Sequence, residues 1–432
     1  QSHNSQKRAL FVSTVPITIT SFLIPLAEML KTQVYELDCA AAKASTYPGL
    51  DLFKNRFNIS WSRSFKDSAL SYFKSTKEIR NIATKGNYSV IHVHTPIAAF
   101  ITRLALRKMG RFGGPAPSII YTVHGFHFHQ AESSRFKNTL FFLAEKLGLC
   151  WTDYLVVMND EDEAAAQKLK AKKNCPFARV CLTQKRAGTQ RCSRKRAQIS
   201  RIDGIGFDFA SRAELKAHND ERRLREAQGQ AQSPNQNYDQ AQTQKPLHLV
   251  MIAELNHNKS QLKLLNELSM LKSEGIPFKM SFIGSGELKT AIESKTLHLG
   301  LQDDVTLHGQ LSQNEIIEIL KTADLGLLVS RREGLPRSLM EMIASGVPVI
   351  GTNTRGIADE VREPHALVSN IGFGELTALI RKLSEEREVL AALSQTQYDY
   401  AIAHFDEPII LDAYKKLYTQ AQADSDRRAK GA

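Results

Sequence analysis

Two glutamates, Glu333 and Glu341, stand eight positions apart in a segment that also contains Gly334, Leu335 and Pro336. Pro336 fits the first turn of a helix, where its missing N–H costs nothing. The amides of Gly334 and Leu335 would then point outward at a helix N-terminus, which suits an anion such as a pyrophosphate. Carboxylates about two turns apart could accept hydrogen bonds from sugar or ribose hydroxyls. Spacing alone leaves a second interpretation open, in which Glu333 caps the helix and Glu341 is a solvated surface residue.

Histidines gather after two strand-like runs in the first half of the chain. His92 and His94 end one run, and His124 and His127 follow the next. His124 is the best candidate to hydrogen-bond a transferred group or to assist an attacking hydroxyl. We expect His92 and His94 to line a cleft or to satisfy buried polar groups, and His127 to belong to the acceptor or cleft residues. No carboxylate pattern accompanies these histidines, so we expect no metal.

The elements that must position these residues are short apolar runs that alternate with helix-like stretches. This alternation predicts an α/β fold with two doubly wound, Rossmann-like domains. The expected strands are 9–13, 34–39, 89–94, 118–123, 154–158, 247–253, 278–283, 305–307, 325–329 and 347–351. Ligands of such sheets bind at the carboxyl ends of the strands, so the expected site is the cleft between the domains.

The length of 432 residues predicts two domains, and composition divides them. We expect an N-terminal domain at 1–207, onto which a C-terminal helix at 405–421 packs back. The segment 208–245 is the expected linker, with a continuing charged helix as the alternative, because much of it is rich in Gln, Ala, Asn and Arg and poor in apolar side chains. The second domain is then 246–404.

The formal net charge of +12 indicates an anionic partner, which could be nucleic acid, an acidic membrane surface or phosphorylated ligands. Part of the excess lies in the basic stretch 168–201, either a solvated loop or a lipid-facing patch. The five cysteines include no Cys-x-x-Cys pair, so we expect neither a disulfide framework nor a zinc site. Such cysteine usage fits a reducing cytoplasm best. The apolar run 9–30 is interrupted by Pro16, so we expect a strand, a loop and a helix there rather than a membrane span.

Around the glutamate pair the chain resembles glycosyltransferase family 4, whose signature is a Glu-x7-Glu segment followed by a run of small residues. The matching landmarks, in chain order, are 283–288, 305–309, 333–341, 344–350 and 354–356. The resemblance covers essentially residues 10–418, except the basic stretch. It implies a GT-B fold, in which two Rossmann-like domains face a central cleft, and a retaining enzyme of the bacterial surface-polysaccharide type.

The resemblance implies a role for each matching position. Glu333 would contact the donor sugar as a catalytic residue, and Glu341 would contact the ribose. The backbone of residues 334–336 would hold the diphosphate, which Lys259 would neutralise. Gly284 and Gly286 would let the backbone approach the nucleotide closely, although an ordinary strand-to-helix turn also explains them.

Two features depart from the family or match it only loosely. Many members carry an arginine five or six positions before the lysine, where this chain has Glu254 and Ala253. Arg331, Arg332 or Arg337 could replace it. In the glycine-free loop expected at 15–20, Thr18 would offer its hydroxyl to the substrate.

These features together predict the transfer of a hexosyl or N-acetylhexosaminyl group from a nucleotide sugar, UDP-linked, to a saccharide or lipid-linked acceptor, with no cofactor. No carboxylate nucleophile for a double displacement is evident, so front-face transfer is the better hypothesis. The alternatives are a UDP-sugar epimerase or hydrolase of the same fold and a nucleic-acid-binding protein. The latter is disfavoured because no aromatic side chains interleave the basic stretch. We expect a cytoplasmic protein, peripheral at the inner face of the plasma membrane.

Overall fold

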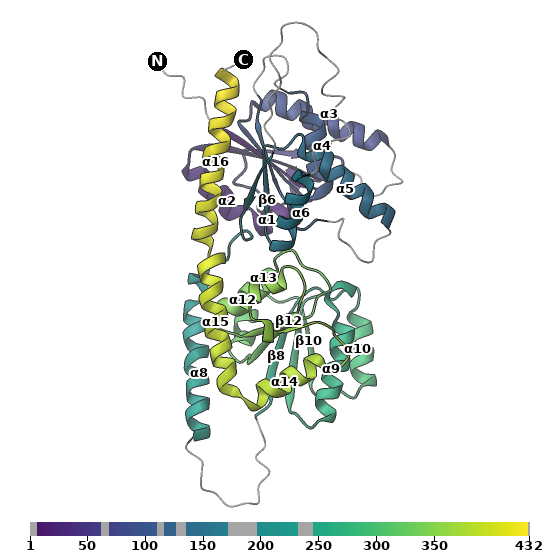
Figure 1. Cartoon of the computed structure of the whole chain (residues 1–432), viewed down its shortest axis with the longest axis vertical. Coiled ribbons are helices and arrows are strands. Elements are labelled where there is room, and N and C mark those ends of the chain that lie inside the picture. Colours follow the sequence, from purple (N-terminus) through teal and green to yellow (C-terminus); the bar gives the residue numbers. More distant parts are fainter. Residues whose placement is uncertain are drawn as a thin grey trace, which may run out of the picture. The chain divides into compact units, whose positions relative to one another are not determined.

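The computed structural model describes residues 7–61, 69–109, 116–126, 135–171, 197–231 and 245–430. The chain divides into two compact units (Figure 1). Unit 1 runs to Ile205 and resumes at Ile410, and unit 2 runs from Gly206 to Ile409. Each unit contains one sheet of parallel strands, with seven strands in unit 1 and six in unit 2 among the described residues. The predicted α/β fold with two doubly wound domains is confirmed.

The sheet of unit 1 has the strand order β3-β2-β1-β4-β5-β6-β7. Its strands are β1 (Lys7–Val12), β2 (Tyr35–Ala41), β3 (Asn55–Asn58), β4 (Val90–His94), β5 (Ser118–Thr122), β6 (Tyr154–Val157) and β7 (Gln198–Arg201). The central strands β4, β5 and β6 are buried along their whole length because both faces of the sheet are covered. In register, Phe11 of β1 lies between Cys39 of β2 and His92 of β4.

Helices cover both faces of this sheet and enclose two apolar cores. They are α1 (Pro16–Phe22), α2 (Ile24–Thr32), α3 (Ala69–Gly86), α4 (Pro96–Leu106), α5 (Arg135–Leu149), α6 (Asp160–Ala171) and α16 (Glu407–Lys430). One core includes residues of α1, α2 and α16, and the other includes residues of α3, α4 and α6. The last helix of the chain, α16, thus completes the unit that the start of the chain builds. Its Tyr414 and Tyr418 are buried there.

The first strand leads directly into a helix rather than into the expected loop at 15–20. Helix α1 begins at Pro16, and its N-cap Val15 is extended. A proline at the first helical position has the required φ and lacks a donor that would have no partner, so it starts a helix readily. Thr18 is therefore a buried helix residue. None of the helices in the described ranges has the length and apolar character that crossing a bilayer requires.

The sheet of unit 2 has the order β10-β9-β8-β11-β12-β13. Its strands are β8 (Leu247–Ile252), β9 (Phe278–Ile283), β10 (Val305–Gly309), β11 (Leu325–Leu328), β12 (Val349–Thr352) and β13 (Leu367–Val368). Its helices are α8 (Ala213–Ala231), α9 (Gln261–Ser273), α10 (Lys289–His298), α11 (Gln313–Leu320), α12 (Arg337–Ala344), α13 (Ile357–Val361), α14 (Glu375–Glu385) and α15 (Arg387–Phe405). In both units the strand order reverses beside the first strand, and this reversal is where doubly wound folds bind ligands.

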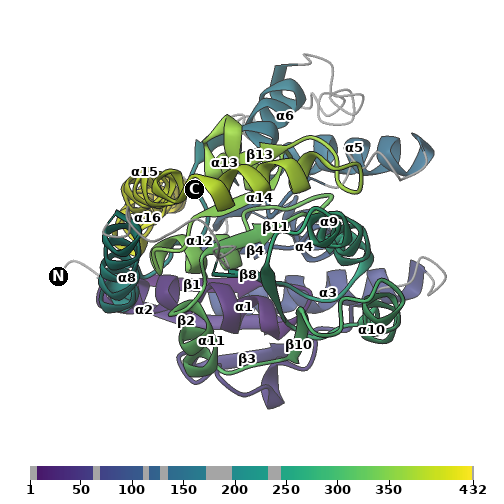
Figure 2. The same ribbon diagram turned by 90° about the horizontal axis from the view of Figure 1, so that it is seen from below.

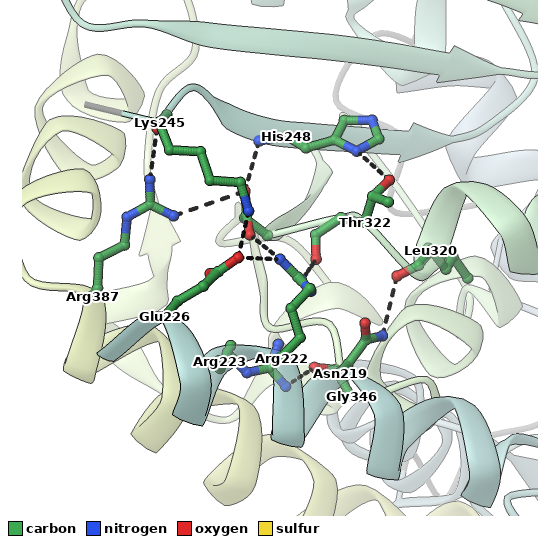
Figure 3. A network of polar contacts seen from close by, with 12 residues as sticks. Asn219, Arg222, Arg223, Glu226, Lys245, His248, Leu320, Thr322, Gly346 and Arg387 are labelled. Carbon is green, nitrogen blue, oxygen red and sulfur yellow. Dashed lines mark hydrogen bonds and ion pairs between the residues drawn. The ribbon is translucent and has the colours of Figure 1, made fainter. Parts of the chain in front are cut away.

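Within the expected linker at 208–245, residues 213–231 form helix α8, which packs against the rest of unit 2. Helix α8 lies beside α15 in two perpendicular views (Figure 1 and Figure 2). Its buried Asn219 donates hydrogen bonds to the carbonyls of Leu320 and Ser345, and Arg222 donates to Asp324 at 2.7 Å. Figure 3 shows the contact of Asn219 with Leu320 and the network around Arg222. The low apolar content suggested a linker because α8 packs against the rest of unit 2 through polar side chains more than through an apolar stripe.

Candidate functional site

The point of strand-order reversal in unit 2 brings Lys259 and Glu333 together. Lys259 follows β8 and Glu333 follows β11, and these two strands are neighbours in the sheet. Lys259 Nζ donates to Glu333 Oε1 at 2.5 Å, across 74 residues of sequence. Both side chains are mostly buried. Lys259 and Glu333, which were both predicted to contact the donor, thus form an ion pair. The pair lies at the strand-order reversal, which is where doubly wound sheets bind ligands.

Backbone contacts fix the two loops that carry this pair. The amide of Lys259 donates to the side chain of Asn256, which caps a short 3-10 helix at His257–Lys259. The amide of Arg331 donates to the carbonyl of Asn258 at 2.8 Å, so the loop after β8 and the loop after β11 are joined directly. The ion pair therefore rests on a defined backbone on both sides.

A third loop, after β12, closes against Glu333 and brings a further cation. Arg355 Nε donates to the carbonyl of Glu333 at 3.1 Å. A Cβ atom on Gly356 would come within 2.5 Å of the carbonyl oxygen of Gly334, so only glycine fits there. Sequence analysis noted Arg355 and Gly356 only as landmarks of the family. Nothing in their spacing showed that Arg355 would reach the glutamate.

The structure excludes both structural alternatives for the glutamate pair. The N-cap of α12 is Pro336, and no side chain caps this helix, so Glu333 is not its cap. Glu341 is buried in α12 rather than solvated, and its Oε1 accepts from Arg212 Nη2 at 3.1 Å. The helix begins at Arg337, which places Leu335 and Pro336 just before its first turn.

The two glycines after β9 have a structural reason within the chain. Gly284 has φ +141°, and a Cβ atom there would lie 2.0 Å from the carbonyl oxygen of Ala253. At Gly286 it would lie 2.3 Å from the carbonyl oxygen of Leu255. The loop 284–288 packs tightly against the loop after β8, and Leu255 N donates to Ser285 O. This packing explains both glycines, whereas their predicted contact with a nucleotide stays a prediction.

Among the three arginines expected to replace the missing family arginine, Arg337 has a defined contact elsewhere. Its guanidinium carbon lies 5.6 Å from the centre of the Phe207 ring. Arg332 is exposed, and its carbonyl accepts from Asn258. Arg355 is the arginine that the structure brings to the backbone of Glu333.

Sequence analysis missed a buried acid, Glu360 of α13. Its side chain is fully buried, and neither carboxylate oxygen has a hydrogen-bond partner among the described residues. Burial, together with the negative charges of Glu333 and Asp359, raises the pKa of Glu360 well above its usual value. The fold therefore favours the protonated, neutral form of Glu360, which lies close to the charged pair.

The corresponding point in unit 1 carries uncharged groups. The amide of Thr14, after β1, donates to Thr95 Oγ1, after β4, at 3.0 Å. Thr95 has a φ of +64°, a left-handed conformation that is strained for a β-branched residue. Beside it, His94 Nδ1 lies 3.2 Å from His124 Nε2, and one of the two rings donates to the other. His94 Nε2 is buried and has no partner among the described residues.

Burial makes these imidazoles neutral. It lowers the pKa of His124 to about 4 and the pKa of His92 to about 3, and it holds the pKa of His94 well below the usual value. The proximity of the rings to one another lowers the pKa of His92 and His94 further. At pH 7 His124 therefore carries no charge, but its neutral ring can donate a hydrogen bond to a ligand or accept one from it.

His92 lies in the interior of unit 1. It is fully buried, with Nδ1 2.8 Å from the Tyr418 hydroxyl and Nε2 2.7 Å from Thr122 Oγ1. Of the two roles expected for it, the structure supports the satisfied buried group and contradicts cleft lining. His127 lies outside the described residues. Among the described residues, His, Cys, Asp and Glu form no group of three that could hold a metal ion.

Comparisons with known proteins assign both units. Residues 10–159 match the family described as Glycosyl transferase 4-like, and residues 234–400 match Glycosyl transferases group 1. EpsD of Bacillus subtilis, named as a glycosyltransferase, is 27% identical over 428 residues, which are 98% of this chain and 99% of that protein.

Two further proteins extend the comparison. An Escherichia coli UDP-Gal:alpha-D-GlcNAc-diphosphoundecaprenol alpha-1,3-galactosyltransferase is 22% identical over 296 residues, 67% of this chain and 64% of that protein. The structure of Anabaena HepE in complex with UDP and glucose aligns with a TM-score of 0.66 at 15% identity, covering 96% of this chain and 100% of that one, a likeness in fold. The chain is therefore a glycosyltransferase of the GT-B fold, which joins a domain that matches the 4-like family to a domain that matches group 1.

Proposed function

We propose that this glycosyltransferase moves a sugar from a UDP-linked donor to a saccharide or lipid-linked acceptor in the synthesis of a bacterial surface polysaccharide, with retention of configuration. The observation that carries the proposal is the Lys259–Glu333 ion pair at the strand-order reversal of unit 2. HepE is described with UDP and glucose, and the E. coli relative is named for a UDP-sugar and a diphosphoundecaprenol acceptor. These names support the choice of donor and acceptor.

The proposed chemistry uses the cations of unit 2 to stabilise the leaving group. When the donor binds, Lys259 leaves its ion pair with Glu333 and pairs with the diphosphate instead. Arg355, which contacts the backbone of Glu333, supplies the second positive charge. Glu333, released from the lysine, accepts hydrogen bonds from the donor sugar, and Glu341 contacts the ribose. The amides that precede α12 add a partial positive charge at the phosphates.

Transfer then proceeds on one face of the sugar. The bond between the anomeric carbon and the diphosphate oxygen breaks, the acceptor oxygen bonds to the same face, and its proton passes to the leaving diphosphate. His124, as a neutral imidazole, hydrogen-bonds the transferred sugar. No metal enters the scheme. This chemistry requires an acceptor, whereas an epimerase or hydrolase would turn over the donor without one.

Two measurements test the proposal. A UDP-sugar should protect the protein against thermal unfolding more than ADP- or GDP-sugars do. Glu333→Ala and Lys259→Ala should each abolish most transfer, whereas Lys289→Ala should not, because Lys289 is an exposed residue of α10. Near-normal transfer by both site variants would show that the assignment of the site is wrong. Donor turnover that is independent of acceptor would favour epimerisation or hydrolysis instead.

A further inference from the structure

Arg212 holds one oxygen of Glu341, the second residue of the glutamate pair. Its guanidinium donates through Nη2 to Glu341 Oε1 at 3.1 Å, and the two side chains are only 11% and 10% exposed. The other oxygen, Oε2, accepts from no described residue and retains access to solvent. A forked arginine contact would occupy both oxygens of a carboxylate. The single contact therefore leaves Oε2 as an acceptor for a ligand.

Further contacts fix the side chain of Arg212. The same Nη2 donates to Gln313 Oε1 at 2.7 Å, and Gln313 is the first residue of α11. The guanidinium carbon lies 5.9 Å from the centre of the Phe207 ring, which is within the range of a cation–π contact. These contacts restrict the rotamers of Arg212, so they also define where Glu341 Oε1 lies.

The backbone that carries Arg212 is anchored at the start of unit 2. Arg212 ends a 3-10 turn at Ala210–Arg212, which follows Phe207 closely. The amide of Phe207 donates to the carbonyl of Phe405 at 2.9 Å, and its carbonyl accepts from the amide of Glu407 at 3.0 Å. The cation is thus delivered by a segment whose backbone is itself paired, within the same unit as Glu341.

The arrangement is a poor one for stability alone. Arg212 Nε is buried and has no partner among the described residues, and an unpaired buried donor costs stability. Glu341 is the one charged residue among the buried positions 339–344 of α12. A hydrophobic side chain there would avoid the desolvation of an ion pair, which the attraction between the charges often fails to offset. These features indicate a ligand for Glu341 rather than a purely structural ion pair.

The chemistry of the free oxygen selects a ligand that donates hydrogen bonds. An ionised carboxylate only accepts them, and the two neighbouring hydroxyls of a ribose ring can donate. A 2′-deoxyribose offers one donor fewer. A site built to hydrogen-bond a hydroxyl discriminates against the analogue that lacks it, because the polar group of the site is then left unpaired. A carboxylate oxygen held in one position can therefore distinguish the two sugars.

We propose that Arg212 is a positioning residue that fixes Glu341 for the 2′- and 3′-hydroxyls of a ribonucleotide donor, and that it thereby makes the site selective against 2′-deoxyribonucleotides. Arg212 acts through Glu341 and does not touch the donor. This role rests on the proposed function, in which Glu341 contacts the ribose.

Titration calorimetry of the full chain with UDP and with 2′-deoxy-UDP tests the proposal. The wild type should bind UDP roughly 10- to 100-fold more tightly, as expected for one hydrogen bond to a charged group. Arg212→Ala should bring the two affinities close together, mainly by weakening the binding of UDP. Arg212→Lys keeps a charged donor and should restore part of the difference. The matched control is Arg225→Ala, which removes an exposed arginine of α8 and should bind both ligands as the wild type does.

Two further variants separate positioning from a general structural role. Glu341→Ala should also lose the discrimination, and adding Arg212→Ala to it should change nothing more, because Arg212 acts through Glu341. Arg212→Met keeps an aliphatic side chain against Phe207 but has no donor. It should behave like Arg212→Ala, and it replaces that variant in the test if Arg212→Ala does not fold.

Two results would overturn this role of Arg212 and leave the donor site standing. In the first, Arg212→Ala and Arg212→Met weaken UDP and 2′-deoxy-UDP equally, as the loss of a structural residue or of a phosphate contact would. In the second, both variants discriminate as well as the wild type. A wild type that binds the two ligands equally would remove the ribose contact of Glu341, and the role of Arg212 with it. A wild type that binds neither would refute the proposed UDP donor itself, and this role would fall as well.

Discussion

The two units place different chemistry at the same topological point. Unit 2 holds charges there, with Lys259 against Glu333 and Arg355 beside them. Unit 1 holds uncharged groups, a threonine pair and the contact between His94 and His124. The charged point suits a ligand that brings its own charge, such as a diphosphate. The neutral one suits hydroxyl groups. The proposed function assigns these two points to two substrates, and what differs between the points is the loops after the strands rather than the sheet.

The largest effect expected is the loss of the ion pair in unit 2. Lys259→Ala and Glu333→Ala should each lower kcat/KM for sugar transfer by roughly 100- to 1000-fold, as loss of a group that stabilises transition-state charge does. The double variant should be little worse than either single variant, because the two residues act as a unit. Steady-state kinetics of the four proteins measures this. Effects that simply multiply would show that the two residues act independently.

In unit 1 the expected loss is smaller, because neutral hydrogen bonds are weaker than charge contacts. His124→Asn should lower kcat/KM by roughly 100-fold. His94 is a positioning residue that orients the His124 ring, so His94→Asn should cost about 10-fold, and His94→Gln should recover part of the loss. Between pH 6 and pH 8 the rate should show no ionisation of His124, whose pKa is about 4. A rate that rises through the ordinary pKa of histidine would contradict this.

Most of the fold could be predicted from the sequence because the central strands of both sheets are short, mainly apolar runs that alternate with helical stretches. Of the strands at sheet edges, β10 was predicted, whereas β3, β7 and β13 were missed. β3 (Asn-Arg-Phe-Asn) and β7 (Gln-Ile-Ser-Arg) are short and polar, since an edge strand is only partly covered. Helix α8 was taken for a linker for a related reason, because polar contacts such as Arg222 with Asp324 attach it. Patterns of hydrophobicity do not record such contacts.

Sequence motifs identified the candidate site residues Lys259, Glu333 and Glu341. The pairing of Lys259 with Glu333 follows from two motifs and the adjacency of their strands, which the alternation of elements made foreseeable. Arg355 and Glu360 could not be found in this way, because their environment depends on how a third loop folds against Glu333. Likewise, the burial of His92 depends on Tyr418, which lies 326 residues later in the chain.

Acid should lower the stability of unit 1 more than that of unit 2. His92, His94 and His124 have folded-state pKa values below their unfolded value, so the unfolded chain binds more protons as the pH falls. Stability is therefore present above pH 6.5 and lost as the pH falls towards 4. Hydrogen exchange of peptides from β4 and β5, measured at pH 7 and pH 5, should report this loss. His94→Gln should reduce the pH dependence, since it removes one of the three groups.

The smallest effect expected is the opposite response in unit 2, where one group rather than three is involved. The pKa of Glu360 is raised in the folded state, so the folded chain binds more protons than the unfolded one between the two pKa values. Stability from this group is fully present below pH 4.5 and declines as the pH rises. Glu360→Gln keeps the shape and cannot ionise, so its stability relative to the wild type should increase from pH 5 to pH 8 in urea unfolding. A difference that stays constant with pH would mean that Glu360 ionises freely, and the contrast between an acid-sensitive unit 1 and an alkali-sensitive unit 2 would fail.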